Sequence, residues 1–198
     1  MGSSLDELPT MLEPMRVYLK RAAELRRTSS LAAFAVRTFA LQVGLTHRER
    51  LRPADLSYLM SLMEELESDK AALNLSPTGE EQERATHDLA MDLYARAHAA
   101  DRLDISHPHP SMKWTVVEAP RVAQAYHASA VLIDALRQFD APPSEKVVEM
   151  QTAAHRRSQQ LSAQLARALN STPCVPMEWR PFPPSMLHTY TSIGVIPV

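Results

Sequence analysis

The chain has 198 residues, of which 45% are hydrophobic and 22% are charged, and its formal net charge is −2. This composition is typical of a globular protein, and the small net charge argues against a general role in binding nucleic acid. No apolar run approaches the ~20 residues that cross a membrane, so we expect a cytoplasmic protein without membrane insertion. The single cysteine, Cys174, cannot form an internal disulfide, which agrees with that location.

Hydrophobic periodicity predicts helices over nearly all of the chain before residue 170. In the first part of the chain we expect three of them, at about 14–27, 30–45 and 53–73. Pro14 and Pro53 suit first helical turns, and Ser29 or Ser30 can cap the second helix. The first helix has a basic outer face, and the second is apolar nearly all round, as expected for a helix between two neighbours.

Three further helices are predicted at about 80–103, 120–139 and 146–170. The segment 104–121 between the first two of these contains three prolines and is expected to be irregular. Strand signals are nearly absent. The sequence therefore predicts an all-α protein.

A faint internal repeat organises these helices. The "AAE" that starts at Ala22 and the "AAD" that starts at Ala99 are 77 residues apart, whereas Phe34 and Tyr126 in the following helices are 92 apart. The second spacing is larger than the first, and an enlarged first loop in the second unit, at 104–121, explains the extra residues. We therefore expect two tandem three-helix bundles, at 14–75 and 80–170, followed by an extended proline-rich C-terminal tail at 171–198.

Few residues suggest catalysis or metal binding. His107 and His109 could share a metal ion, but no convincing third ligand lies near them, so a solvated loop pair explains them better. Cys174 has no identifiable partner base, and no Ser–His–Asp set is evident. We expect no catalytic residue, no metal site and no cofactor, and the sequence favours binding over enzymatic activity.

The stretch "DLSYLMSLMEELESDK" at 55–70 carries an unusually wide apolar stripe. At ~100° per residue its apolar side chains span an arc of ~160°, whereas a helix that packs on one neighbour needs ~100° or somewhat more; these residues are Leu56, Leu59, Met60, Leu62, Met63, Leu66 and Leu73. Two bundle neighbours would explain the width. An apolar groove would explain in addition why Glu64 and Glu67 line one edge, since carboxylates there would suit an amphipathic helix that carries Arg or Lys.

Three segments resemble the amino-terminal region of the Vta/LIP family, which are ESCRT-associated cofactors of the AAA ATPase that disassembles ESCRT-III. These are "PMRVYLKRAAELRRTSSLAAFAVRTFALQVGL", "YLMSLMEELESDKAAL" and "AYHASAVLIDALRQF". The family pattern "LMD.LE..K" is matched by "LMEELESDK" at 62–70, and "F..AS.LID" by "YHASAVLID" at 126–134. The resemblance covers about 14–169, interrupted by the longer 104–121 segment.

The resemblance implies two microtubule-interacting-and-transport (MIT) domains that bind the C-terminal tails of ESCRT-III subunits. It places a tail helix in the groove beside the third helix, where Met63 and Leu66 match groove contacts. We infer Glu64 and Glu67 as acidic partners for basic residues on the tail. The family contacts its ATPase through a distal domain, which we expect outside this chain, and acts in multivesicular body sorting after recruitment to endosomes.

Alternatives remain open at this point. The chain could be a helical scaffold or repeat fragment that binds an unrelated helical partner, or more remotely a hydrolase without a recognisable motif. The tail sequence "TPCVPMEWRPFPP" at 172–184 either covers a seam between helices or docks on one of the two grooves and competes with a partner. The sequence does not define the contacts of the second unit.

Overall fold

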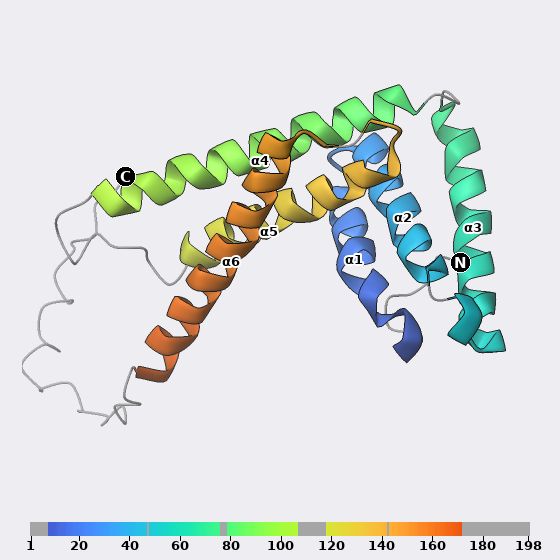
Figure 1. The fold of residues 1–198 in the computed structure, drawn as a ribbon, viewed down its shortest axis with the longest axis horizontal. Helices are drawn as coiled ribbons and strands as arrows, with labels where there is room; N and C mark the ends of the chain where they lie inside the picture. The colour runs from blue at the N-terminus through green and yellow to red at the C-terminus, as the bar shows by residue number, and fades with distance from the viewer. Residues whose placement is uncertain (1–7, 47, 76–78, 107–117, 142, 172–198) are drawn as a thin grey trace, which may run out of the picture.

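The computed structural model describes residues 8–46, 48–75, 79–106, 118–141 and 143–171, and in these ranges it is helical without any strand. The six α-helices are α1 Arg16–Leu25, α2 Ser30–Leu45, α3 Pro53–Leu73, α4 Glu80–Ser106, α5 Glu118–Ala135 and α6 Glu145–Ser171 (Figure 1). The described ranges also contain three short 3-10 helices, η2 Thr10–Met15, η3 Arg48–Arg50 and η5 Leu136–Gln138. The predicted all-α fold is confirmed.

Local signals explain where α2 and α3 begin and where α3 ends. The Ser29 hydroxyl accepts a hydrogen bond from the backbone N–H of Ala32 and caps α2 at 3.4 Å. The Asp55 carboxylate accepts one from the backbone N–H of Arg52 at 2.8 Å and closes the first turn of α3. Asn74, with φ of 54°, ends α3 in the left-handed conformation. These ends agree with the expected ranges 30–45 and 53–73.

The first helix differs from its expected range. Pro14 lies inside the 3-10 helix η2 and not in the first turn of α1, which begins at Arg16 and ends at Leu25. The expected range 14–27 was therefore too long at both ends. A proline removes a backbone donor, and the tighter 3-10 turn accommodates it before the α-helix starts.

The expected irregular segment 104–121 was also too long. α4 continues to Ser106, and α5 already begins at Glu118. Pro120 is the third residue of α5, a first-turn position where its missing N–H breaks no intrahelical hydrogen bond. Residues 107–117, with both predicted loop histidines, lie outside the described residues, as does the tail from 172 onward.

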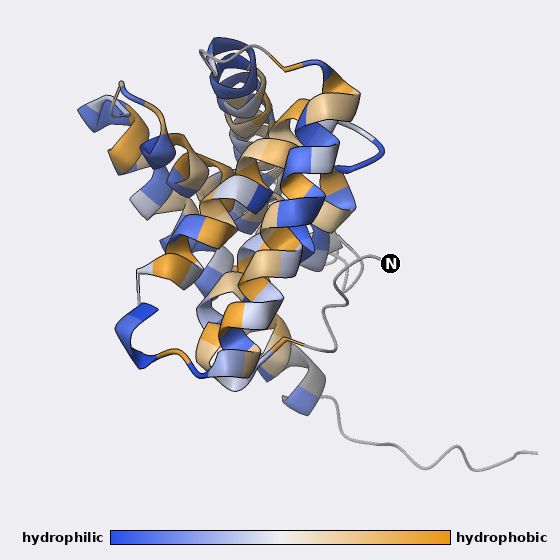
Figure 2. Ribbon diagram, turned by 90° about the vertical axis from the view of Figure 1, so that its right-hand side faces the viewer, coloured by the Kyte–Doolittle hydropathy of each residue, from blue (hydrophilic) through white to orange (hydrophobic). Residues whose placement is uncertain are grey.

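Helix α2 occupies the centre of the fold. In Figure 1 it lies between α1 and α3, while α4 crosses above it, and it contacts α1, α3, α4 and α5. One buried cluster joins α1, α2 and α3 with the residues just before α1, and its members are Leu8, Leu12, Met15, Leu19, Ala40, Leu59, Leu62 and Leu66. Figure 2 shows polar residues interspersed with apolar ones along the helices, so that each helix turns part of its surface outward.

A second buried cluster connects the first three helices to the last three. It contains Ala22, Leu25, Ala32, Ala33 and Val36 together with Ala90, Leu132, Ile133 and Ala135. Its many alanines let the helices approach closely. A third cluster lies within α4, α5 and α6 around Tyr126 and Leu161. The two sets of helices therefore share a continuous core, and the division at 14–75 and 80–170 stays a prediction.

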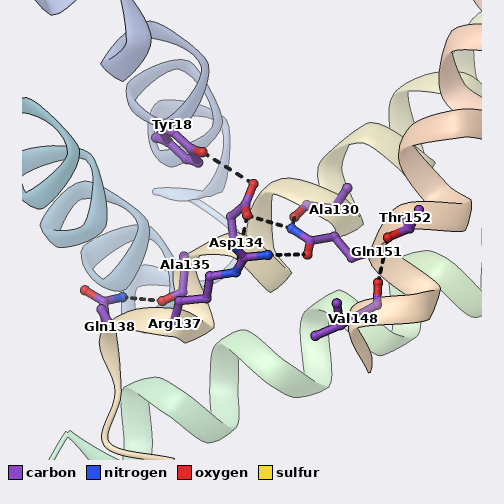
Figure 3. Close-up of polar contacts among 9 residues, drawn as sticks. All are labelled: Tyr18, Ala130, Asp134, Ala135, Arg137, Gln138, Val148, Gln151 and Thr152. Carbon is purple, nitrogen blue, oxygen red and sulfur yellow. Dashed lines mark hydrogen bonds and ion pairs between the residues drawn. The ribbon is translucent and has the colours of Figure 1, made fainter. Parts of the chain in front are cut away.

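Polar contacts reinforce the same connection between α1, α5 and α6 (Figure 3). The Tyr18 hydroxyl on α1 donates to Asp134 Oδ2 on α5 at 3.3 Å, and Gln151 Nε2 on α6 donates to Asp134 Oδ1 at 2.7 Å. Burial, and then the neighbouring Asp134 carboxylate, raise the pKa of Tyr18 to about 12. Arg137 Nη2 donates to Gln151 Oε1 at 3.1 Å. This network orients the second set of helices against α1.

Candidate functional site

The wide apolar stripe of α3 is divided between the core and the surface. Leu59 and Leu62 are buried, whereas Leu56, Met60 and Met63 are 41%, 62% and 47% exposed. These three exposed residues, which we call the α3 stripe, follow one another at intervals of four and three residues and share one helix face. A solvent-facing apolar stripe on a packed helix leaves a surface on which another apolar element can pack.

The α3 stripe leads into a hollow between α2 and α3 with a volume of about 290 Å³, here called the junction pocket. From α2 it is lined by Phe34, Ala35, Thr38 and Leu41, and from α3 by Met63, Leu66, Glu67 and Lys70. Most of these groups are apolar, and the two charged side chains come from the second half of α3. The pocket therefore combines an apolar floor with charges of both signs.

The second set of helices supplies the remaining wall. Leu75 and Gly79 between α3 and α4, Gln82 at the start of α4, and Gln138 and Phe139 after α5 all line the junction pocket. Gly79 adopts a φ of +71°, which favours glycine, and a Cβ there would lie 3.5 Å from the Phe139 ring. The 3-10 helix η5 ends the predicted 120–139 helix early, at Ala135, and leaves Phe139 in extended backbone where it closes the pocket.

Charge is distributed unequally around α3. Arg37 of α2 forms ion pairs with Glu65 and Asp69, which hold one side of α3 against α2. Glu64 and Glu67 are exposed, and neither forms an ion pair with any residue that the structure describes. These two carboxylates therefore remain available to a basic partner.

The four residues predicted from the sequence do not all lie in the same place. Met63, Leu66 and Glu67 line the junction pocket, with Met63 half exposed and Leu66 only 6% exposed, while Glu64 is exposed but does not line it. Leu66 thus belongs to the buried core and also forms the pocket floor. Whether a partner binds these residues stays a prediction.

Sequence reasoning missed most of the opposite wall. The residues it did not single out are Phe34 and Thr38 on α2, and Gln82, Gln138 and Phe139 from the second set of helices. The apolar character of α2 on nearly all sides hinted that Phe34 had a second role. No local signal pointed to Gln82 or Phe139, because they reach the pocket through the packing of one set of helices on the other.

A second hollow, of about 420 Å³, lies between α5 and α6. It is lined by Pro120, Ala123, Gln124, His127, Ser158, Leu161, Ser162 and Leu165. The His127 ring faces His155 of α6, with ring centroids 6.1 Å apart. Burial, and then the nearby Arg21 cation, lower the pKa of His127. The α5–α6 hollow is an opening that belongs to the second set of helices alone.

The described part of the chain contains neither a cluster of metal-binding side chains nor a membrane-spanning helix. Among the described residues no group of three or more His, Cys, Asp and Glu side chains is placed to hold a metal ion. His107, His109 and Cys174 lie outside those residues. None of the helices in the described ranges has the length and apolar character needed to cross a bilayer.

Fold and site together define an all-α helical-bundle protein with an open groove beside its third helix. A family model described as "Vta1 like" matches residues 14–167, so the chain belongs to the Vta1-like family. The chain is also 30% identical, over 141 residues, to a protein of Arabidopsis thaliana named "homolog of mammalian LYST-interacting protein 5". That match covers 67% of this chain and 29% of the Arabidopsis protein, so the chain corresponds to less than a third of that relative. The resemblance seen in the sequence is confirmed.

Proposed function

We propose that this chain is the ESCRT-III-binding adaptor module of a Vta1-like cofactor in multivesicular body sorting. In this proposal the groove formed by the α3 stripe and the junction pocket binds the amphipathic C-terminal tail helix of an ESCRT-III subunit. The AAA ATPase that disassembles ESCRT-III is contacted through a distal domain outside this chain. The module acts in the cytoplasm and is recruited peripherally to endosomes, without catalytic activity of its own.

One observation carries the proposal. The exposed α3 stripe is continuous with an apolar pocket, and the carboxylates of Glu64 and Glu67 stand beside it without ion-pair partners among the described residues. An amphipathic helix with apolar anchors and a basic residue complements such a groove. A micromolar complex corresponds to about 8 kcal/mol, which a few buried apolar anchors and one charge-assisted hydrogen bond can supply.

Two weak sites suit a reversible adaptor. The α5–α6 hollow supports a second docking position, since Ala123, Leu161 and Leu165 give it apolar walls. A polymer that displays many tails would raise the effective concentration at the second site once the first is occupied. The avidity of the chain for such a polymer would then exceed its affinity for any single tail.

A titration tests the proposal. Fluorescently labelled synthetic peptides that correspond to the C-terminal tails of ESCRT-III subunits are titrated with the chain, and the dissociation constant is measured by anisotropy. We expect micromolar binding of at least one peptide and about tenfold or greater weakening by Met63→Asp, because a carboxylate in an apolar contact costs at least about 1.4 kcal/mol. Met11→Asp is the matched control, since Met11 is 41% exposed and does not line the junction pocket.

The alternative is a helical scaffold that binds an unrelated helical partner. If no tail peptide binds, or if Met63→Asp and Met11→Asp have equal effects, the ESCRT-III assignment of this groove is wrong. If an unrelated amphipathic helix binds and the tail peptides do not, the result would favour the alternative, a helical scaffold.

A further inference from the structure

The junction pocket belongs to both sets of helices. Its walls come from α2 and α3 on one side and from Gln82 and Phe139 on the other. Gln138 fixes this arrangement, because its Nε2 donates to the backbone carbonyl of Ala35 on α2 at 2.9 Å and to that of Ala135 at 2.8 Å. Any side chain that fills the pocket must therefore contact residues from both sets.

Gln82 has an unused hydrogen-bond acceptor at this place. The side chain is only 5% exposed, and its Oε1 has no hydrogen-bond partner among the described residues. A buried amide oxygen without a donor is unfavourable, and such groups are uncommon in folded proteins. The terminal torsion of a glutamine is soft, so its amide can turn toward a donor that enters the pocket.

The size and charge of the pocket define what it can hold. An apolar cavity of roughly 150 Å³ already accommodates benzene. The junction pocket, at about 290 Å³, has room for a bulky apolar side chain together with part of a neighbouring one. Glu67 and Lys70 line it, and Glu64 is exposed on α3 one turn before Glu67 but outside the lining, so acidic side chains outnumber basic ones on this part of α3 beside the pocket. A basic side chain complements this balance and supplies N–H donors.

We propose that the tail helix docked on α3 inserts a bulky apolar side chain into the junction pocket, and that an adjacent Arg or Lys pairs with Glu67 and donates to Gln82 Oε1. This inference rests on the proposed function, and it adds that one tail contacts both sets of helices. Occupancy of the first groove then strengthens the contact between the two sets. Phe139 acts as the closing wall of the pocket, and Gln82 selects for the basic residue.

The variant Gln82→Met separates binding from folding. It keeps the length of the side chain but removes the unpaired acceptor, so we expect the melting temperature of the free chain to rise. The tail peptide should nevertheless bind about tenfold more weakly, because a hydrogen bond to a charged donor is lost. A purely structural role for Gln82 would not produce a more stable chain with a weaker affinity. Gln159→Met, at an exposed glutamine of α6, is the matched control and should change neither quantity.

The variant Phe139→Ala opens the wall of the junction pocket and should also weaken binding of the tail peptide about tenfold, since the ring would no longer cover the inserted side chain.

A double-mutant cycle between Gln82 and the peptide identifies the hydrogen-bond donor on the peptide. The tightest-binding tail peptide is compared with a version in which the basic residue beside its apolar anchor is replaced by Met. For that version we expect Gln82→Met to have no further effect.

The outcomes distinguish the inference from the proposed function. If Met63→Asp weakens binding but neither Gln82→Met nor Phe139→Ala does, the shared site is wrong and the groove assignment stands. If Gln82→Met acts equally on both peptides, the basic residue does not meet Gln82 and the inference is wrong. If no tail peptide binds the unmodified chain, both proposals fail together.

Discussion

The guanidinium of Arg157 on α6 forms two hydrogen bonds to the carboxylate of Asp101 on α4. Nε donates to Oδ2 at 2.7 Å and Nη2 donates to Oδ1 at 2.6 Å. The hydroxyl of Tyr126 on α5 donates to the same Oδ2 at 3.2 Å. Burial, and then the Asp101 charge, raise the pKa of Tyr126. One buried carboxylate thus connects all three helices of the second set.

Replacement of this carboxylate should destabilise the chain. We expect Asp101→Ala to lower the free energy of unfolding by about 2 kcal/mol, less than the 3–5 kcal/mol typical of fully buried pairs, because Arg157 keeps some contact with water. Urea denaturation measures the change. The exposed Asp88 on the same helix is the control, and Asp88→Ala should alter the stability by less than about 0.5 kcal/mol. Equal effects of the two variants would contradict the prediction.

Gly44 marks a close approach between α2 and its neighbours. A Cβ at this position would lie 2.5 Å from Met15 Sδ and 2.9 Å from Leu59 Cδ2, and both side chains are buried. We expect Gly44→Val to lower the free energy of unfolding by about 1–3 kcal/mol through overpacking. Thermal and urea unfolding would report the loss. Gln42→Val, at an exposed position of the same helix, should be nearly neutral, and a neutral Gly44→Val would show that the core has room.

The pKa of His127 predicts how stability depends on pH. Burial and Arg21 lower this pKa in the folded chain, with His155, Glu24 and Lys20 also nearby, whereas the unfolded chain keeps a value of about 6.5. Between the two values the unfolded state binds more protons, so the free energy of unfolding rises with pH.

The contribution of His127 to the free energy of unfolding is therefore complete above about pH 6.5, its pKa in the unfolded chain. This contribution decreases as the pH falls below that value toward the lowered pKa in the folded chain. We expect urea denaturation at about pH 5, 6 and 7 to show that the free energy of unfolding changes less with pH in His127→Gln than in the unmodified chain. An unchanged slope would mean that other groups carry the pH dependence.

The two sides of the apolar arc on α3 should respond differently to truncation. Leu66→Ala removes a buried side chain and should cost about 2–5 kcal/mol of stability. Met60→Ala removes a side chain that is 62% exposed and should leave stability within about 0.5 kcal/mol. In the tail-peptide titration Met60→Ala should nevertheless weaken binding. A stability loss at Met60 without loss of affinity would indicate that the α3 stripe is covered within the chain itself.

The helices were predictable because each carries its own pattern. The amphipathic period of α3, the Ser29 cap of α2 and the proline at position 53 are all readable within one or two turns. The end of α5 was not predictable in this way, because it coincides with a distant contact. The 3-10 turn that ends α5 positions Gln138 against Ala35, which is 103 residues away in the sequence.

Part of the candidate site could also be predicted from the sequence. The apolar arc contains Met63 and Leu66, which the family resemblance singled out, and the acidic border contributed Glu64 and Glu67. Met63, Leu66 and Glu67 line the junction pocket, whereas Glu64 does not. The pattern did not say which side of the arc would be buried. That division depends on where α2 and the residues of η2 and α1 pack against α3.

The sequence by itself determined an all-α chain, the family, and the face of α3 on which a groove could form. Only the tertiary structure decided that this groove ends in a pocket shared by both sets of helices, with Gln82 and Phe139 as its far wall. The physical reason is that periodicity records which side chains share a helix face, a property of neighbours along the chain. Which element covers that face depends on the packing of segments far apart in the sequence, here through the alanine-rich cluster that joins α2 to α4 and α5.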